Sequence, residues 1–245
     1  MSPRDPDENG WAHSAPAWIS RSAEGADFAR RHVLDRPMMA RVRQAAPRNA
    51  LDIGCGEGRF CRMMADIGIA TTGLDPVAAM IDAAKTAQPD GTFVEGFAEA
   101  LPFEDASFDL VVSYLSLIDI DDANSAIAEM ARVLRPAGRI LVANLSSFAT
   151  SSAIAGRKTC KDTGEEIRPL GRYLQHGKIW FEWDGLRVRN WHRPLSTYLG
   201  AFLEHGLTLT CFDEPQPHDC TQTEYAKYQA MPYLMMMEWQ NITSG

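Results

Sequence analysis

A glycine-rich loop between a short apolar run and a helix-like segment constrains this chain more than any other feature. The run ends in Leu51-Asp52-Ile53, and the loop continues as Gly54-Cys55-Gly56-Glu57-Gly58. Glycines let the backbone turn tightly from a strand into a helix, and they let a ligand approach the peptide groups. The sequence therefore predicts a strand–loop–helix unit of an α/β sheet, with a binding site where the strand ends.

Strand-like and helix-like segments alternate on both sides of this loop. The segment 108–114 is almost wholly apolar, which is typical of a strand buried on both faces of a sheet. The alternation predicts a parallel, doubly wound sheet with right-handed crossovers. We expect strands at 50–53, 69–75, 92–95, 108–114, 139–144, 207–212 and 233–239, and helices at 57–67, from Pro76 onwards, at 123–134 and at 194–205.

Two flanking segments depart from the alternation. Residues 11–45 have apolar side chains at helical intervals, and Pro37 is expected to separate two helices there. Residues 146–193 look like an insertion between sheet elements, with a hairpin at 179–191 around the turn Asp184-Gly185.

Composition excludes several classes of protein. The 245 residues are 45% hydrophobic, enough for one sizeable core, and the net charge of −8 argues against a nucleic-acid partner. No apolar run is long enough to span a membrane, and the first residues lack the apolar core of a signal peptide. The five cysteines form no C-x-x-C pair, so we expect no metal site and reduced thiols in a cytoplasm.

A second acid, Asp75, ends the second predicted strand, 21 residues after Gly54. An ionised carboxylate at that point can accept hydrogen bonds from both hydroxyls of a ribose. The glycine loop and Asp75 together predict a ligand with an adenosine part. A dinucleotide is disfavoured, because Arg59 replaces the last glycine of the G-x-G-x-x-G fingerprint and Asp52 would repel a pyrophosphate. Asp52 instead suits a cationic ligand with a sulfonium and an amino group.

At this point the chain resembles the class I S-adenosylmethionine-dependent methyltransferases, in particular the bacterial group commonly labelled type 11. Four motifs carry the resemblance, in the order and spacing of the family. They are the loop 51–58, Gly73-Leu74-Asp75-Pro76, Ala98-Glu99-Ala100-Leu101-Pro102-Phe103 followed by Ser107-Phe108-Asp109-Leu110-Val111-Val112, and Arg132-Val133-Leu134-Arg135-Pro136-Ala137-Gly138-Arg139. The resemblance implies a Rossmann-like sheet of seven mostly parallel strands, the last antiparallel, with helices on both faces. It also implies S-adenosyl-L-methionine as cofactor and S-adenosyl-L-homocysteine as product.

The resemblance further implies which residues hold the cofactor. The main chain of Gly54 and Gly56 would face the methionine part, with Asp52 nearby, and Asp75 would bind the ribose hydroxyls. Cys55 and Pro76 lie within the same two motifs and count among the expected contacts, and Met80 would pack on the adenine.

One position departs from the family pattern. The residue after Gly96 usually carries an acid that recognises the adenine amino group, but here it is Phe97. Glu99, a water or the main chain would take that role, and the N–H of Ala98 can donate to an adenine ring nitrogen. Ser113 and Tyr114, at the end of the fourth strand, would line the methyl-transfer site.

The same resemblance divides the single domain 1–245 into parts. Residues 11–45 would form an N-terminal helical lid, 49–145 the cofactor-binding core, 146–193 an acceptor-side lid, and 194–240 the end of the sheet. Aromatic side chains in the two lids suit an apolar or aromatic acceptor, and they equally suit ordinary packing. These side chains are Trp11, Trp18, Tyr173, Trp180, Trp183 and Trp191.

His192 is the first candidate for a general base, because it follows the predicted hairpin and histidine titrates near neutral pH. An equally weighted alternative is a histidine that only ties the lid or a helix end. Tyr114 is a second candidate, as a positioning hydroxyl. The sequence thus predicts methyl transfer to a small organic acceptor, with the O, N or C acceptor atom left open. The alternatives are a protein that modifies S-adenosylmethionine itself and a non-catalytic, regulatory protein that binds the cofactor.

Overall fold

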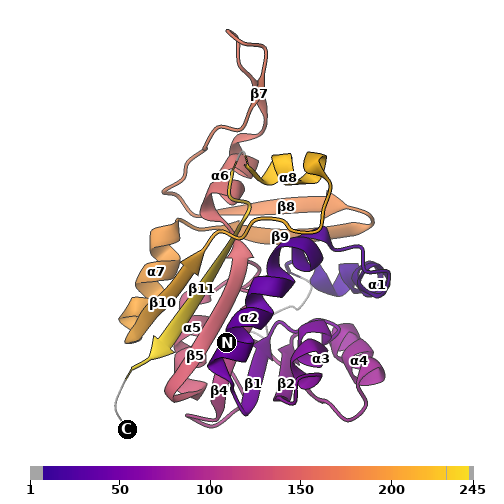
Figure 1. Cartoon of the computed structure of the whole chain (residues 1–245), viewed down its shortest axis with the longest axis vertical. Coiled ribbons are helices and arrows are strands. Elements are labelled where there is room, and N and C mark those ends of the chain that lie inside the picture. Colours follow the sequence, from indigo (N-terminus) through magenta and orange to yellow (C-terminus); the bar gives the residue numbers. More distant parts are fainter. Residues whose placement is uncertain (1–7, 230, 243–245) are drawn as a thin grey trace.

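The computed structural model describes residues 8–229 and 231–242, and a seven-stranded sheet forms its centre (Figure 1). The strands lie in the order β10-β11-β5-β4-β1-β2-β3, and β11 alone runs antiparallel to the others. This confirms the predicted fold class. The bounds are β1 Asn49–Ile53, β2 Ala70–Asp75, β3 Thr92–Glu95, β4 Phe108–Tyr114, β5 Leu134–Leu145, β10 Leu207–Asp213 and β11 Leu234–Asn241.

Helices cover both faces of the sheet, as the alternating pattern predicted. On one face, α5 (Ala123–Val133) and α7 (Leu195–Glu204) pack over β4, β5 and β10. On the other face lie α2 (Asp35–Ala45) and α3 (Arg59–Ala65), and α4 (Ala78–Ala87) packs beside β2 and β3.

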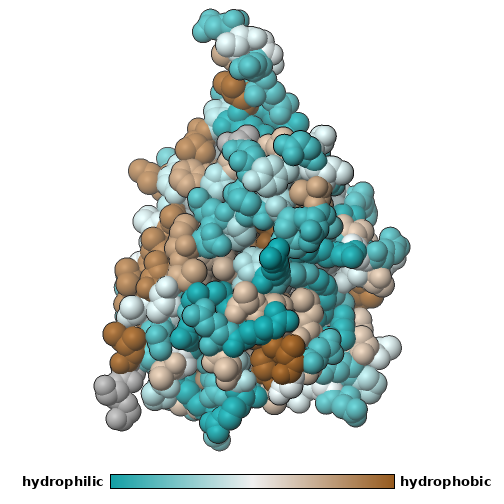
Figure 2. Space-filling view, viewed as in Figure 1, coloured by the Kyte–Doolittle hydropathy of each residue, from teal (hydrophilic) through white to brown (hydrophobic). Residues whose placement is uncertain are grey.

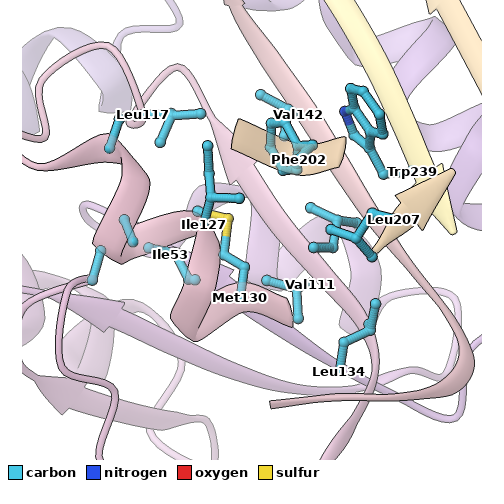
Figure 3. Packing of buried hydrophobic residues seen from close by; sticks show 14 of the residues in the cluster. Ile53, Val111, Leu117, Ile127, Met130, Leu134, Val142, Phe202, Leu207 and Trp239 are labelled. Carbon is cyan, nitrogen blue, oxygen red and sulfur yellow. The ribbon is translucent and has the colours of Figure 1, made fainter. Parts of the chain in front are cut away.

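The larger hydrophobic core lies under α5 and α7 (Figure 3). Neighbouring residues of β4 point to opposite faces, so Val111 enters this core while Val112 enters the cluster under α2. Phe202 of α7 stacks on Trp239 of β11, with ring centroids 4.7 Å apart, and both side chains are fully buried. Burial on both faces explains why β4 reads as an unbroken apolar run.

The N-terminal segment forms α1 (Trp11–Ala23), the π-helical stretch η1 (Arg30–Leu34) and α2. The expected break at Pro37 is wrong, because Pro37 lies within the first turn of α2. The break instead falls near Gly25, whose φ of +68° suits glycine, and Asp27 then accepts the N–H of Arg30 at 3.1 Å. The wider turn of η1 directly before Pro37 accommodates its missing N–H and its ring.

Residues 146–193 lie beyond the end of β5, where Figure 1 shows a hairpin beside α1 and a short two-stranded finger that projects outward. The hairpin was predicted, and Asp184 and Gly185 at its turn have the positive φ of a type I′ turn. The strands of this hairpin are β8 Gly177–Trp183 and β9 Leu186–His192. The elements that were not predicted are α6 Ser147–Ala155, β6 Lys158–Thr159, β7 Glu166–Ile167 and α8 Gln222–Gln229.

The surface is mixed in character, with hydrophobic side chains along the edge occupied by α7 and β10 (Figure 2). Among the described helices, none combines the length and the apolar character needed to cross a membrane. Within residues 8–229 and 231–242, no group of His, Cys, Asp or Glu side chains is arranged to hold a metal ion. All five cysteines are free thiols.

Candidate cofactor and acceptor site

A cavity opens at the carboxyl ends of β1, β2, β3 and β4, where the glycine loop turns into α3. Its space amounts to about 1380 Å³ with the open mouth included. The sheet brings most of the predicted site residues into this one space. The predicted residues that line it are Asp52, Gly54, Cys55, Gly56, Asp75, Pro76, Met80, Phe97, Ala98, Glu99 and Tyr114.

The glycine loop has two distinct requirements for glycine. A Cβ at Gly54 would lie 2.3 Å from the Cβ of Ser116, so the loop after β4 packs directly on this peptide. A Cβ at Gly56 would meet nothing nearer than the indole nitrogen of Trp18 at 3.8 Å. Both residues have positive φ, which strains other residue types. The backbone at Gly56 therefore faces open space, as a ligand-binding loop requires.

Asp75 holds this loop in place from the end of β2. Its carboxylate accepts the N–H of Gly56 at 3.0 Å and the N–H of Val77 at 2.9 Å. Burial raises the pKa of Asp75 to about 6, although these two hydrogen bonds act to lower it. Each carboxylate oxygen still has a lone pair available, so Asp75 can also accept from a bound diol.

Asp52 is the most isolated acid of the cavity. It is 1% exposed, its Oδ2 accepts the thiol of Cys61 at 3.6 Å, and its Oδ1 has no hydrogen-bond partner in the described structure. Burial raises the pKa of Asp52 to about 7. A buried carboxylate oxygen that lines a cavity without a partner indicates a ligand that completes it.

Asp119 is a site residue that the sequence reasoning missed. It lines the cavity after β4, accepts the indole N–H of Trp11 at 2.9 Å, and also accepts the amide of Asn190 from β9. Burial raises the pKa of Asp119 to about 7. The signal was present as three acids in Ile118-Asp119-Ile120-Asp121-Asp122, directly after the strand end that topology places at the site.

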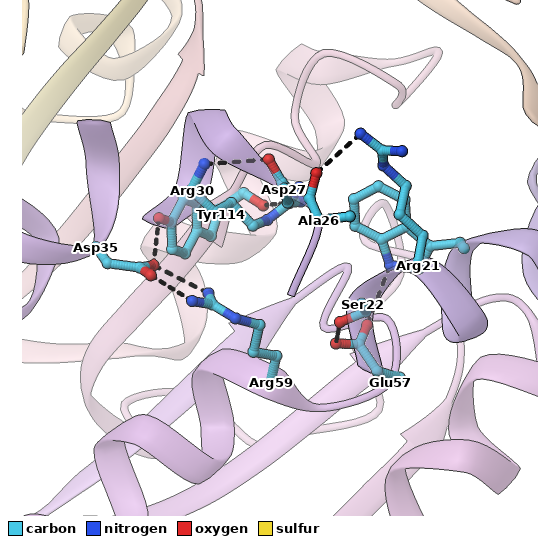
Figure 4. Close-up of polar contacts among 10 residues, drawn as sticks. Arg21, Ser22, Ala26, Asp27, Arg30, Asp35, Glu57, Arg59 and Tyr114 are labelled. Carbon is cyan, nitrogen blue, oxygen red and sulfur yellow. Dashed lines mark hydrogen bonds and ion pairs between the residues drawn. The ribbon is translucent and has the colours of Figure 1, made fainter. Parts of the chain in front are cut away.

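Helix α1 closes over the cavity through contacts to the glycine loop. Glu57 accepts the indole N–H of Trp18 at 3.1 Å and the hydroxyl of Ser22 at 2.5 Å. The guanidinium of Arg30 lies 4.8 Å from the ring centre of Trp18 and is paired with Asp27 at 2.6 Å (Figure 4). The predicted aromatic lining is thus present for Trp11 and Trp18, whereas Tyr173, Trp180, Trp183 and Trp191 lie outside the cavity wall.

Tyr114 reaches the cavity, but its hydroxyl is already engaged. It donates to Asp35 at 2.8 Å, and Asp35 in turn binds both terminal nitrogens of Arg59 (Figure 4). Burial raises the pKa of Tyr114 well above its usual range, so the phenol is neutral near pH 7. Tyr114 can therefore position groups at this end of the cavity, but it cannot serve as a base in this arrangement.

His192 lies outside the cavity wall and is completely buried. Its Nδ1 lies 2.7 Å from the hydroxyl of Thr150 in α6, and its Nε2 lies 2.9 Å from the carbonyl oxygen of Tyr173. Burial lowers the pKa of His192, which favours the neutral ring. With both nitrogens bonded within residues 146–193, the geometry favours the alternative role of a histidine that ties this segment together.

Ser113 also lies behind the cavity wall. Its hydroxyl is 2.7 Å from that of Ser116 and accepts the N–H of Leu117 at 3.0 Å. Leu115 between them has a φ of +57°, an unusual conformation for leucine, and it lines the cavity. Ser113 thus shapes the turn that presents Leu115 and Ser116 to the cavity.

Comparison with known proteins agrees with this geometry. Residues 51–142 match the family described as methyltransferase domain. The demethylmenaquinone methyltransferase of Renibacterium salmoninarum is 38% identical over 96 residues, which cover 39% of this chain. The match spans only 40% of that relative's length.

Two solved structures cover more of the fold. An S-adenosylmethionine-dependent methyltransferase from Mesorhizobium loti has a TM-score of 0.69 at 26% identity, covering 78% of this chain and 90% of that one. A protein from Listeria monocytogenes assigned to the same class has a TM-score of 0.71 at 21% identity, covering 82% and 95% of the two chains. The second likeness, at lower identity, shows the fold alone.

Proposed function

This chain carries the methyltransferase domain of the type 11 family of class I S-adenosylmethionine-dependent methyltransferases, and from this premise we propose that it methylates a small organic acceptor. The observation that carries the proposal is the unpartnered, buried Oδ1 of Asp52 beside an open glycine loop. A ligand with a cationic centre and an adenosine part satisfies both features. The residues present therefore fit S-adenosyl-L-methionine.

We assign the parts of the cofactor to parts of the cavity. Asp75 would hold the ribose, and Met80, Phe97, Ala98 and Glu99 would surround the adenine. The main chain at Gly54 and Gly56, with Asp52, would receive the amino-acid part. Arg30 is a half-buried cation on the same wall and offers a partner for the carboxylate of that part.

When bound, S-adenosylmethionine supplies a methyl group on a sulfonium, which leaves as a neutral thioether. The protein's own contribution is then chiefly to position the reactants and to exclude water. Trp11 and Trp18 are anchored by Asp119 and Glu57, so they hold α1 over the cavity. Rigid anchoring of this kind keeps an acceptor close to the reacting centre without a residue that must move a proton.

The acceptor would occupy the end of the cavity between α1, η1 and the end of β4. Trp18, Arg31, Tyr114 and Leu115 line that end, and they suit a small, partly aromatic molecule with polar groups. The extension of the cavity to these residues favours an enzyme over a protein that only binds the cofactor. We place the reaction in a reducing compartment such as the cytoplasm, in line with the free thiols of all five cysteines.

Calorimetry tests the cofactor first. We expect S-adenosylmethionine and S-adenosylhomocysteine to bind in the micromolar range, about −7 to −8 kcal/mol, and NAD or NADP far more weakly. Tight dinucleotide binding would contradict the proposal. A screen of metabolites with radiolabelled methyl donor then identifies the acceptor, and breakdown of the cofactor without a methylated product would favour the alternative that the cofactor itself is modified.

A further inference from the structure

Three carboxylates in the cavity differ from the other buried acids of the chain. Asp52, Asp75 and Asp119 are each less than a tenth exposed, and among the described residues none of them has an arginine or lysine within ion-pair distance. Buried charges are normally paired, because an isolated charge is costly to remove from water. These three acids therefore lack the paired positive charge that a buried carboxylate normally has.

Glu238 is a buried acid of the same protein that is paired with arginines. It is 1% exposed, like Asp52, but its carboxylate contacts Arg41 at 2.6 Å and Arg139 at 2.7 Å. The chain thus neutralises a buried acid where it serves structure. It leaves three acids of the cavity at the carboxyl edge of the sheet without such partners, which points to a cation supplied from outside.

Asp52 provides an independent sign that this cation is a ligand. Asp52 lines the cavity, and its Oδ1 is buried and has no partner in the described structure. Asp119 shares its surroundings, because Arg30 and Asp75 act on the charges of both acids. Because the same neighbouring charges act on both carboxylates, the two acids lie in one electrostatic field. A single positive charge on a ligand therefore attracts both.

We propose that Asp119, together with Asp52, makes this cavity selective for the sulfonium form of the cofactor over the neutral thioether left after methyl transfer. The inference rests on the proposed function and adds a specificity residue to it. S-adenosylmethionine and S-adenosylhomocysteine differ by one methyl group and one positive charge. The field of unpaired carboxylates acts on the charged groups that both ligands share and, in the substrate only, on the sulfonium. It therefore favours the substrate over the product, compared with a cavity that lacks these carboxylates.

Asp119 is suited to this role because its position is fixed. Trp11 from α1 and Asn190 from β9 both donate to its carboxylate, so it cannot turn towards solvent. The charged or titratable groups that face it are Asp75 at the end of β2, Arg30 of η1 and Tyr198 of α7. Arg30 is already bound to Asp27 at 2.6 Å, so it screens Asp119 only in part.

Calorimetry on two variants separates charge from structure. Asp119→Asn removes the charge and keeps the size, and we expect about tenfold weaker binding of S-adenosylmethionine at pH 8, equal to about 1.4 kcal/mol. Binding of S-adenosylhomocysteine should change less than about threefold. Trp18→Phe is the matched control, because it removes an equivalent indole hydrogen bond that anchors α1, the one to Glu57, and leaves Asp119 and its partners in place. It should change both affinities by the same factor.

Other outcomes overturn the inference. Equal losses for both ligands in Asp119→Asn would make this residue a structural anchor, and unchanged affinities would remove it from the site. If the wild-type protein binds neither ligand, the proposed function fails and the inference fails with it. If Asp119→Asn does not fold, calorimetry of both ligands on the wild-type protein at pH 8 and at pH 5.5 takes its place. Protonation of the carboxylates should then weaken S-adenosylmethionine more steeply than S-adenosylhomocysteine, and parallel curves refute the proposal.

Discussion

Asp52→Asn should make the ligand-free protein more stable at pH 8, although it removes a charge from the binding site. The pKa of Asp52 is raised from 3.8 to about 7, chiefly by burial. A carboxyl whose pKa is higher in the folded than in the unfolded state stabilises the fold while it is protonated, and this contribution is lost as the pH rises through the folded pKa. At pH 8 the ionised Asp52 therefore destabilises the fold.

The size of this effect follows from the shift. A pKa shift of about 3 units corresponds to about 4 kcal/mol at most, since each unit is worth about 1.4 kcal/mol. The asparagine keeps an oxygen for the Cys61 thiol but adds amide hydrogens that need partners, which reduces the gain. We expect a net gain of about 1–3 kcal/mol at pH 8, or about 2–4 °C in melting temperature for each kcal/mol.

Thermal unfolding of the ligand-free protein at pH 5.5 and pH 8 measures the prediction. At pH 5.5 the carboxyl of Asp52 is mostly protonated in the folded protein but ionised in the unfolded chain, so the substitution should still give about half of the gain expected at pH 8. Glu238→Gln is the matched control, because Glu238 is equally buried but its pKa is lowered by Arg41. Removing its charge leaves Arg41 and Arg139, which are partly exposed, without their carboxylate partner and should lose about 1–3 kcal/mol at pH 8. If Asp52→Asn lowers the melting temperature equally at both pH values, the burial argument is wrong.

Three further substitutions test individual side chains. Asp75→Ala should weaken S-adenosylmethionine binding by about 2–4 kcal/mol in calorimetry, because the ribose hydroxyls lose their charged acceptor, and unchanged affinity in a folded variant would place the ribose elsewhere. His192→Ala should lower the free energy of unfolding by about 1–3 kcal/mol and leave cofactor affinity intact, since Thr150 and Tyr173 lose their partner; a turnover loss of about 10²–10⁴ together with loss of a pH step near neutrality would instead support a general base. Tyr114→Phe should lower the free energy of unfolding by about 1–2 kcal/mol without shifting the pH–rate profile, and a shifted profile would reinstate its hydroxyl in the chemistry.

The sheet and the cofactor half of the cavity were predictable because local patterns determine them. The strands at Thr92–Glu95 and Phe108–Tyr114 have the predicted bounds. Phe108–Tyr114 is an apolar run because helices bury it on both sides, and Thr92–Glu95 is a short edge strand whose buried residue is Phe93. Asp75 was predictable for a related reason, since the ends of parallel strands meet at one edge of the sheet.

Helix α6 was not predictable from hydrophobic periodicity. Its buried residues are Ser147, Thr150, Ser151 and Ser152 rather than an apolar stripe. Hydrogen bonds hold two of these side chains, Thr150 to His192 at 2.7 Å and Ser151 to the carbonyl of Gly171 at 2.9 Å. A helix buried through polar contacts has no period to detect, because its partners lie in other segments of the chain.

Asp119 was missed because its role depends on contacts that no local pattern contains. The chain holds 32 acidic and 24 basic side chains, and residue type alone does not show which of them are paired. Trp11 reaches Asp119 across 108 residues of sequence, and Asn190 reaches it across 71. These contacts fix a carboxylate without neutralising it, whereas Arg41 and Arg139 neutralise Glu238. Pairing therefore decides which buried acids can attract a cationic ligand, and pairing arises only once the lids have folded onto the sheet.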